Sequence, residues 1–252
     1  MKTFQPDPQS WQPIQALLAS GLPQAMLAVG DSGSLLRLHL DALQAATLCF
    51  KPTDEGFACE QCRSCKLLAE GSHPDLWVAA PEPGKQIAID TLRQAMEWIQ
   101  YTPQVSNSRW LRIDNAEAMT VAAANAILKT LEEPPTRAHV VLHSEQASRL
   151  LPTIRSRLQR IPLPEMQMVQ SMHWLQQQGV DAENSGALLR QLGNRPLRAL
   201  ELWEAGWLEQ RQQWLRSLLD LSGQGVVAAL KLAEQWSKSS DLPLIREMVL
   251  NV

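Results

Sequence analysis

The chain has 252 residues, of which 45% are hydrophobic and 19% charged, and its formal net charge is −3. This length allows a sizeable core in one or two domains, and the slightly acidic balance argues against a protein that binds nucleic acid mainly by neutralising phosphates. The sequence contains no apolar run of the ~20 residues that a spanning helix needs, and no signal-peptide pattern at its start. We therefore expect a cytoplasmic protein that does not contact a membrane, in which clustered cysteines indicate metal binding.

The first predicted strand runs into a glycine turn. Its apolar residues, 25–29, are followed by Gly30 and Gly33 and then by a predicted helix, which is the order found around a phosphate-binding loop. Counting the loop motif from Gly30 puts Leu36 where the phosphate-binding lysine belongs and Arg37 where the magnesium-binding hydroxyl belongs. The segment is either an ordinary turn or a phosphate loop that has lost its chemistry, and both interpretations predict no ATP hydrolysis.

The chain's four cysteines lie close together in sequence. Cys49 comes near the end of the helix predicted from residue 33 to about 50, and Cys59, Cys62 and Cys65 follow at C-x-x-C-x-x-C spacing. Four thiolates are the ligand set of a closed structural zinc site, and this spacing is typical of one. An iron–sulfur cluster and a set of free thiols are the alternatives. Because no coordination position is left for water, we expect a structural zinc ion rather than a catalytic one.

A further strand and helix follow the cysteines. A turn that includes His73 leads into a strand at 76–80, and residues 89–99 have the apolar spacing of an amphipathic helix for which Asp90 is a possible cap. We interpret His73 as a turn residue rather than a spare metal ligand. The alternation of strands and helices predicts an α/β sheet with helices on both faces.

The middle of the chain alternates most regularly. A short apolar strand ends at Asp114, and a helix that Thr120 can cap stops before Pro134. A second, β-branched strand follows at 139–143, and Arg157 comes after a short helical piece. Since ligands of such sheets gather at the carboxyl ends of the strands, the glycine turn and Asp114 belong to the same edge.

Several of these residues match a known family. The run NAILKTLEEPP at 125–135 resembles the NALLKTLEEPP signature of bacterial clamp-loader subunits, the gamma/tau and delta prime proteins of DNA polymerase III in the AAA+ superfamily. Ser156-Arg157-Leu158 resembles that family's Ser-Arg-Cys motif, with Leu158 in place of the cysteine. The four cysteines match a zinc module that the family inserts after its first helix. The resemblance is specific in these segments and weak after about residue 204.

The resemblance implies an AAA+ fold whose ATP site is degenerate. Asp114 and Asn115 lie where the family carries its Walker B acids, but Asn115 is neutral and replaces the glutamate that orients the attacking water. Asp114 could still help to hold magnesium, although with Arg37 opposite it would serve only as a structural partner. Because the lysine, the hydroxyl and the glutamate are all absent, the chain resembles the delta prime type rather than the gamma/tau type, and we expect it neither to bind nor to hydrolyse ATP.

Arg157 is the residue expected to act in catalysis. An arginine in this place can reach across a subunit interface and stabilise the charge that grows on a neighbour's γ-phosphate. The alternative is that Arg155, Arg157 and Arg160 form a solvated basic edge. The family motif favours a trans-acting role for Arg157, on the ATP site of a partner.

The predicted organisation has three parts. Residues 1–164 form the AAA+ core with the inserted zinc module at 49–65, and 165–205 form a three-helix lid. Residues 206–252 begin a helical collar for oligomerisation, and we expect the chain to end partway into it. The helices predicted in the last two parts span 166–177, 182–192, 196–204, 208–221, 226–236 and 242–251.

The resemblance implies a non-hydrolysing subunit of the DNA polymerase III holoenzyme, a DNA-directed nucleotidyltransferase active in DNA replication. Its partners would be the gamma/tau and delta subunits of a pentameric ring, which uses ATP to load a sliding clamp onto primed DNA. The alternatives are an active gamma/tau-type ATPase and a zinc-dependent adaptor that binds nucleic acid. The acidic residues that offset the basic ones around the cysteines argue against the adaptor.

Overall fold

The computed structural model describes residues 6, 8–31, 33–82, 84–164, 166–221 and 225–237. The chain divides into two compact units, Met1–Met166 and Gln167–Val252. The helix predicted at 242–251 lies outside the described residues. Within the described part of the chain, no helix combines the length and the apolar character needed to cross a membrane.

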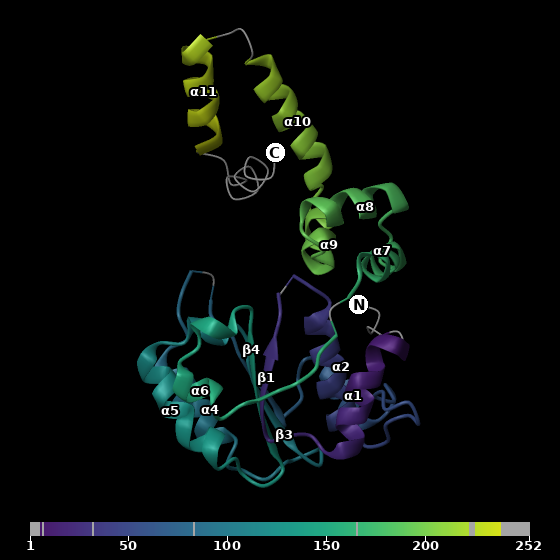
Figure 1. The fold of residues 1–252 in the computed structure, drawn as a ribbon, viewed down its shortest axis with the longest axis vertical. Helices are drawn as coiled ribbons and strands as arrows, with labels where there is room; N and C mark the ends of the chain where they lie inside the picture. Colours follow the sequence, from purple (N-terminus) through teal and green to yellow (C-terminus); the bar gives the residue numbers. More distant parts are fainter. Residues whose placement is uncertain are drawn as a thin grey trace. The chain divides into compact units, whose positions relative to one another are not determined.

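The first unit is built on a parallel five-stranded sheet (Figure 1). Its strand order is β2-β3-β4-β1-β5, so the first strand of the chain lies inside the sheet between β4 and β5. Parallel neighbours need crossover connections, and helices supply them on both faces. The strands are β1 (Ala25–Val29), β2 (Leu76–Ala79), β3 (Arg109–Ile113), β4 (Ala138–Ser144) and β5 (Gln159–Arg160).

The helices of this unit cover both faces of the sheet. One face carries α1 and α2, and the other carries α4, α5 and α6 (Figure 1). Each face has its own hydrophobic core, which is the arrangement expected for a sheet of mostly buried parallel strands. The helices are α1 (Pro8–Ser20), α2 (Leu36–Leu48), α3 (Arg63–Ala69), α4 (Ile89–Trp98), α5 (Val121–Glu132) and α6 (Pro152–Arg155), with short 3₁₀ turns η1 (Ala116–Ala118) and η2 (Ala147–Arg149).

The interior strand β3 shows how the sheet separates the two cores. Trp110 packs with the core under α1 and α2, whereas Leu111 and Ile113 pack with the core under α4 and α5. This alternation follows from the two-residue period of a strand. Arg112 shares the face of Trp110, so a charged side chain is buried beside α2.

The sequence-based boundaries are corrected at three places. Helix α2 begins at Leu36 rather than residue 33, because Asp31 accepts hydrogen bonds from the backbone N–H groups of Gly33 and Ser34 and so holds that stretch as a turn. Asp90 is not the cap of α4, since it lies in the first turn, where its carboxylate is 3.5 Å from Arg93. The two-residue strand β5 was not predicted, because so short a strand has no recognisable period.

The second unit consists of helices. In it, α7 (Met168–Gln177), α8 (Ala182–Gln191) and α9 (Pro196–Glu204) pack against one another around buried residues such as Leu175, Leu188 and Leu202. Helix α10 (Trp207–Asp220) follows α9 and begins with a buried tryptophan, and α11 is formed by Gly225–Ser237. Arg198 on α9 pairs with Glu201 one turn later.

Candidate functional site

The glycine turn after β1 is packed and hydrogen-bonded by neighbouring groups of the chain itself. The Leu36 side chain is buried against Gly30, so closely that a Cβ atom added at Gly30 would lie 2.3 Å from Leu36 Cδ1. The Gly33 N–H donates to the Asp31 carboxylate at 2.8 Å, and the Gly30 N–H donates to the Ser144 carbonyl. A phosphate loop needs free backbone N–H groups and a cation, whereas this turn carries a carboxylate and a leucine.

Asp114 is held by an internal cation. Arg112 Nε lies 3.1 Å from Asp114 Oδ1, an ion pair without hydrogen-bond alignment, and the same guanidinium donates to Asp41 on α2. Burial by itself would lower the pKa of Arg112, but Asp41 and Asp114 raise it above its usual value. Arg112, and not the exposed Arg37, pairs with Asp114: Arg112 lies two residues before Asp114 and so points to the same face of the sheet.

Arg157 contacts the signature run at 125–135. Its Nε donates to Glu132 Oε1 at 2.6 Å, at the end of α5, and its NH1 group donates to the Thr153 carbonyl at 2.8 Å and to Ser156 Oγ at 3.3 Å. The side chain is still 32% exposed. The guanidinium is therefore ordered at the surface by contacts from two sequence segments.

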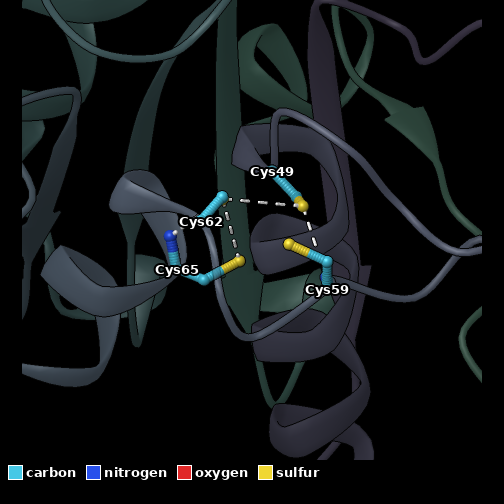
Figure 2. A group of neighbouring side chains, drawn as sticks. All are labelled: Cys49, Cys59, Cys62 and Cys65. Atoms are coloured by element: carbon cyan, nitrogen blue, oxygen red, sulfur yellow. Dashed lines mark hydrogen bonds between the residues drawn. The ribbon is translucent and has the colours of Figure 1, made fainter.

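The four cysteines converge on one point. Their sulfur atoms all lie within 4.8 Å of one another, and the side chains of Cys49, Cys59, Cys62 and Cys65 gather between the end of α2 and the start of α3 (Figure 2). Cys49 Sγ is 3.9 Å from Cys62 Sγ, which is 3.5 Å from Cys65 Sγ. Four sulfurs at 2.3 Å from a tetrahedral zinc ion would be about 3.8 Å apart, so the donor set fits zinc.

Backbone donors add to the metal-binding character of this cluster. Burial raises the pKa of the Cys49 thiol, and the N–H groups of Lys51 and Cys59, which point at Cys49 Sγ at 3.4 and 3.3 Å, offset only part of that shift. Burial raises the pKa of the Cys62 thiol, but hydrogen bonds from the N–H groups of Cys65 and Phe50 outweigh it and hold that pKa at about 6. N–H groups directed at sulfur favour the thiolate, which is the form that ligates metals.

His73 anchors this cluster to the sheet. Its Nδ1 accepts from the Asp75 N–H at 3.1 Å, which leaves the proton on Nε2 to be shared by Ser64 Oγ and Ser106 Oγ, and both hydroxyls donate to the Leu48 carbonyl. Burial lowers the pKa of His73, and the nearby Asp75 opposes only part of that shift. Both imidazole nitrogens are thus used in a buried hydrogen-bond network.

Some of these roles had no signal in the sequence. Arg112 and Glu132 are charged residues at ordinary positions of a strand and a helix, and their partners lie 71 and 25 residues away along the chain. The period of β3 could have placed Arg112 on the same face as Asp114. No local pattern could have paired Glu132 with Arg157.

The chain is similar to known proteins over most of its length. A sequence profile described as "DNA polymerase III, delta subunit" matches residues 7–167. The chain is 40% identical over 226 residues to "DNA polymerase III subunit delta'" of Pseudomonas aeruginosa, covering 88% of the chain and 67% of that protein. Relatives of the same name from Haemophilus influenzae and Escherichia coli are 36% and 32% identical, and the chain spans 58% of each.

Solved structures support the fold. A DNA polymerase III gamma subunit-related protein from Thermotoga maritima superposes with a TM-score of 0.51 at 21% identity, covering 96% of this chain and 77% of that one. The AAA+ type of parallel sheet predicted from the sequence is confirmed. The profile match and the relatives named delta' show that the chain belongs to the family of DNA polymerase III delta prime subunits.

Proposed function

We propose that this chain is a non-hydrolysing subunit of a DNA polymerase III clamp loader and acts on a neighbouring ATPase subunit through Arg157. In this proposal it sits in a pentameric ring with gamma/tau-type and delta-type subunits, and the ring loads a sliding clamp onto primed DNA in the cytoplasm. The names of the relatives support a place among the DNA polymerase III subunits. The observation that supports a non-hydrolysing role is the glycine turn, in which Leu36 packs against Gly30 and Asp31 accepts the Gly33 N–H.

The absence of ATP hydrolysis follows from three local features. Leu36 replaces the lysine of a phosphate loop and packs against Gly30, the Gly33 N–H donates to Asp31, and Asp114 forms an ion pair with Arg112. Phosphoryl transfer needs a cation, a metal site and a water-orienting group in place together. Each of the three would have to be rebuilt before this chain could hydrolyse ATP.

Arg157 is suited to act in trans. It is ordered by Glu132 and Thr153 yet remains partly exposed, so a neighbour's phosphate would meet a guanidinium that has already lost much of its rotamer freedom. An arginine supplied from outside an ATP site is worth ~10³ to 10⁵ in rate in enzymes where it has been measured.

Zinc is assigned a structural role. Cys49, Cys59, Cys62 and Cys65 would hold it with no position open for water, and the loop they belong to contributes few side chains to either core. The ion would stabilise this loop, as metal sites do where apolar burial is too small.

The decisive test is Arg157→Ala in a ring reconstituted with gamma/tau-type and delta-type subunits. We expect the ring to assemble normally and turnover at the ATP site beside this chain to fall by ~10³ or more. Arg137→Ala is the matched control, since Arg137 is also exposed but lies outside the Ser-Arg motif, in the turn before β4. Unchanged ring ATPase would remove Arg157 from the mechanism.

A calorimetric titration of ATP and magnesium into the purified chain separates this proposal from an active gamma/tau-type ATPase without any partner. We expect no saturable heat at millimolar ATP, because the turn's N–H groups and the Leu36 side chain leave no phosphate site. Micromolar binding would restore the ATPase alternative.

A further inference from the structure

Three arginines within six residues behave differently in the structure. Arg157 turns toward α5 and binds Glu132. Arg155 and Arg160 instead line a cavity of about 420 Å³. Within the described residues, neither of these two side chains forms an ion pair or a side-chain hydrogen bond, and both residues are exposed. The three arginines therefore do not share one environment.

The cavity has an apolar floor. Leu27 and Val29 of β1 form part of it, and Ala147 and Leu158 add to its walls. These β1 side chains lie on the sheet face of α4 and α5, whereas the helix of the glycine turn, α2, lies on the other face. The cavity therefore lies on the opposite face of the sheet from α2.

The lining has a marked charge. It includes two arginines and no acidic residue, in a chain whose formal net charge is −3. An apolar floor with unpaired guanidinium groups beside it matches an apolar side chain flanked by carboxylates, since arginine binds carboxylates in a bidentate, planar geometry. Nucleic acid fits less well, because phosphates gain nothing from an apolar floor.

We propose that this cavity, together with Arg155 and Arg160, is a docking site for an acidic and apolar segment of the ATPase subunit that lies next to this chain in the ring. The proposal rests on the function proposed above, because it takes Arg157 to face that same neighbour. The segment that carries Arg157 also supplies Arg155, Leu158 and Arg160, so docking here would set the position of the guanidinium at the interface.

The first experiment measures the dissociation constant between the full chain and the ATPase subunit at low and moderate salt. Arg155→Ser and Arg160→Ser should each weaken binding about tenfold at low salt, and the loss should shrink as salt rises. Arg137→Ser removes the same charge at a residue that does not line the cavity and should stay within about twofold of the unchanged chain. Equal effects of all three variants would overturn the proposal.

The second experiment probes the cavity itself. Ala147→Trp adds bulk to the wall without changing charge and should weaken binding while leaving its salt dependence intact. A photo-crosslinker at position 147 should capture a peptide of the ATPase subunit that contains aspartate or glutamate beside an apolar residue. Capture of DNA, of a second copy of this chain, or of no peptide from the ATPase subunit would overturn the proposal.

The two proposals fail in distinguishable ways. If Arg157→Ala stops the neighbour's turnover while Arg155→Ser, Arg160→Ser and Ala147→Trp bind normally, the docking site is wrong and the trans-acting arginine stands. If the unchanged chain does not bind the ATPase subunit, the proposed function is wrong and the docking site falls with it.

Discussion

The glycine turn and the arginine segment lie on the same sheet but satisfy their polar groups in opposite ways. At the turn, Leu36 covers Gly30 and Asp31 takes up a loop N–H, while Arg112 neutralises the nearby Asp114. In the arginine segment, Arg155 and Arg160 have no acidic partner among the described residues, and Arg157 stays partly exposed. In the function proposed above, this difference would let one chain do without a nucleotide site of its own and still offer an arginine to another subunit.

The cysteine cluster resembles the glycine turn in that its groups contact one another, and disrupting it should have the largest effect of the changes below. Cys65→Ser removes one of four converging sulfurs, so we expect zinc affinity to fall by a factor on the order of 100 or more. Zinc release to a chromophoric chelator measures this, and the cobalt-substituted protein should lose part of its thiolate absorption. Ala58→Ser changes the same loop without touching a thiol and serves as the control. Equal zinc retention by both variants would show that the cluster does not bind metal.

Arg112→Leu tests whether the ion pair with Arg112 stabilises the buried Asp114 carboxylate. It leaves the buried Asp114 carboxylate without its cation, whereas Asp41 is 43% exposed and can be hydrated. We expect a loss of about 3 kcal/mol in the free energy of unfolding, measured with denaturant. The exposed Arg93→Leu should cost less than about 0.5 kcal/mol. Similar losses for both variants would mean that the Arg112 ion pairs do not stabilise the fold.

Gly30→Ala tests the packing at the turn. Its new methyl group would lie 2.3 Å from Leu36 Cδ1, so we expect a cost of about 1–2 kcal/mol in unfolding free energy. Leu36→Ala removes the obstructing atoms, and the double variant should therefore cost less than the sum of the two single ones. Strict additivity would show that Leu36 does not fill the space over Gly30.

Glu132→Gln tests the contact that orders Arg157 in the arginine segment, and it should have the smallest effect of these changes. The amide keeps the shape of Glu132 but loses the charge that orders Arg157, so the neighbour's kcat should fall about three- to tenfold with little change in KM. Glu133→Gln, next to it and exposed, is the matched control. If both variants leave kcat unchanged, Glu132 does not orient Arg157.

Much of the molecule was predictable from local patterns. The apolar runs marked β1 to β4, the Thr120 hydroxyl accepts the Ala123 N–H as a cap should, and the run at 125–135 identified the family. Strand β5 escaped because two residues carry no period. Asp90 was misassigned because several positions at a helix start can accept N–H groups, and the backbone path alone selects among them.

The sequence alone determined the patterns formed by residues at short spacing. Examples are the C-x-x-C-x-x-C run and the leucine in place of a lysine, which could be interpreted before any fold was known. The partners of the charged groups could not be predicted from the sequence. Arg112 meets Asp41 across 71 residues, and Arg157 meets Glu132 across 25. Such pairs form only when the sheet brings distant segments together, because an ion pair depends on separation in space and not on separation along the chain.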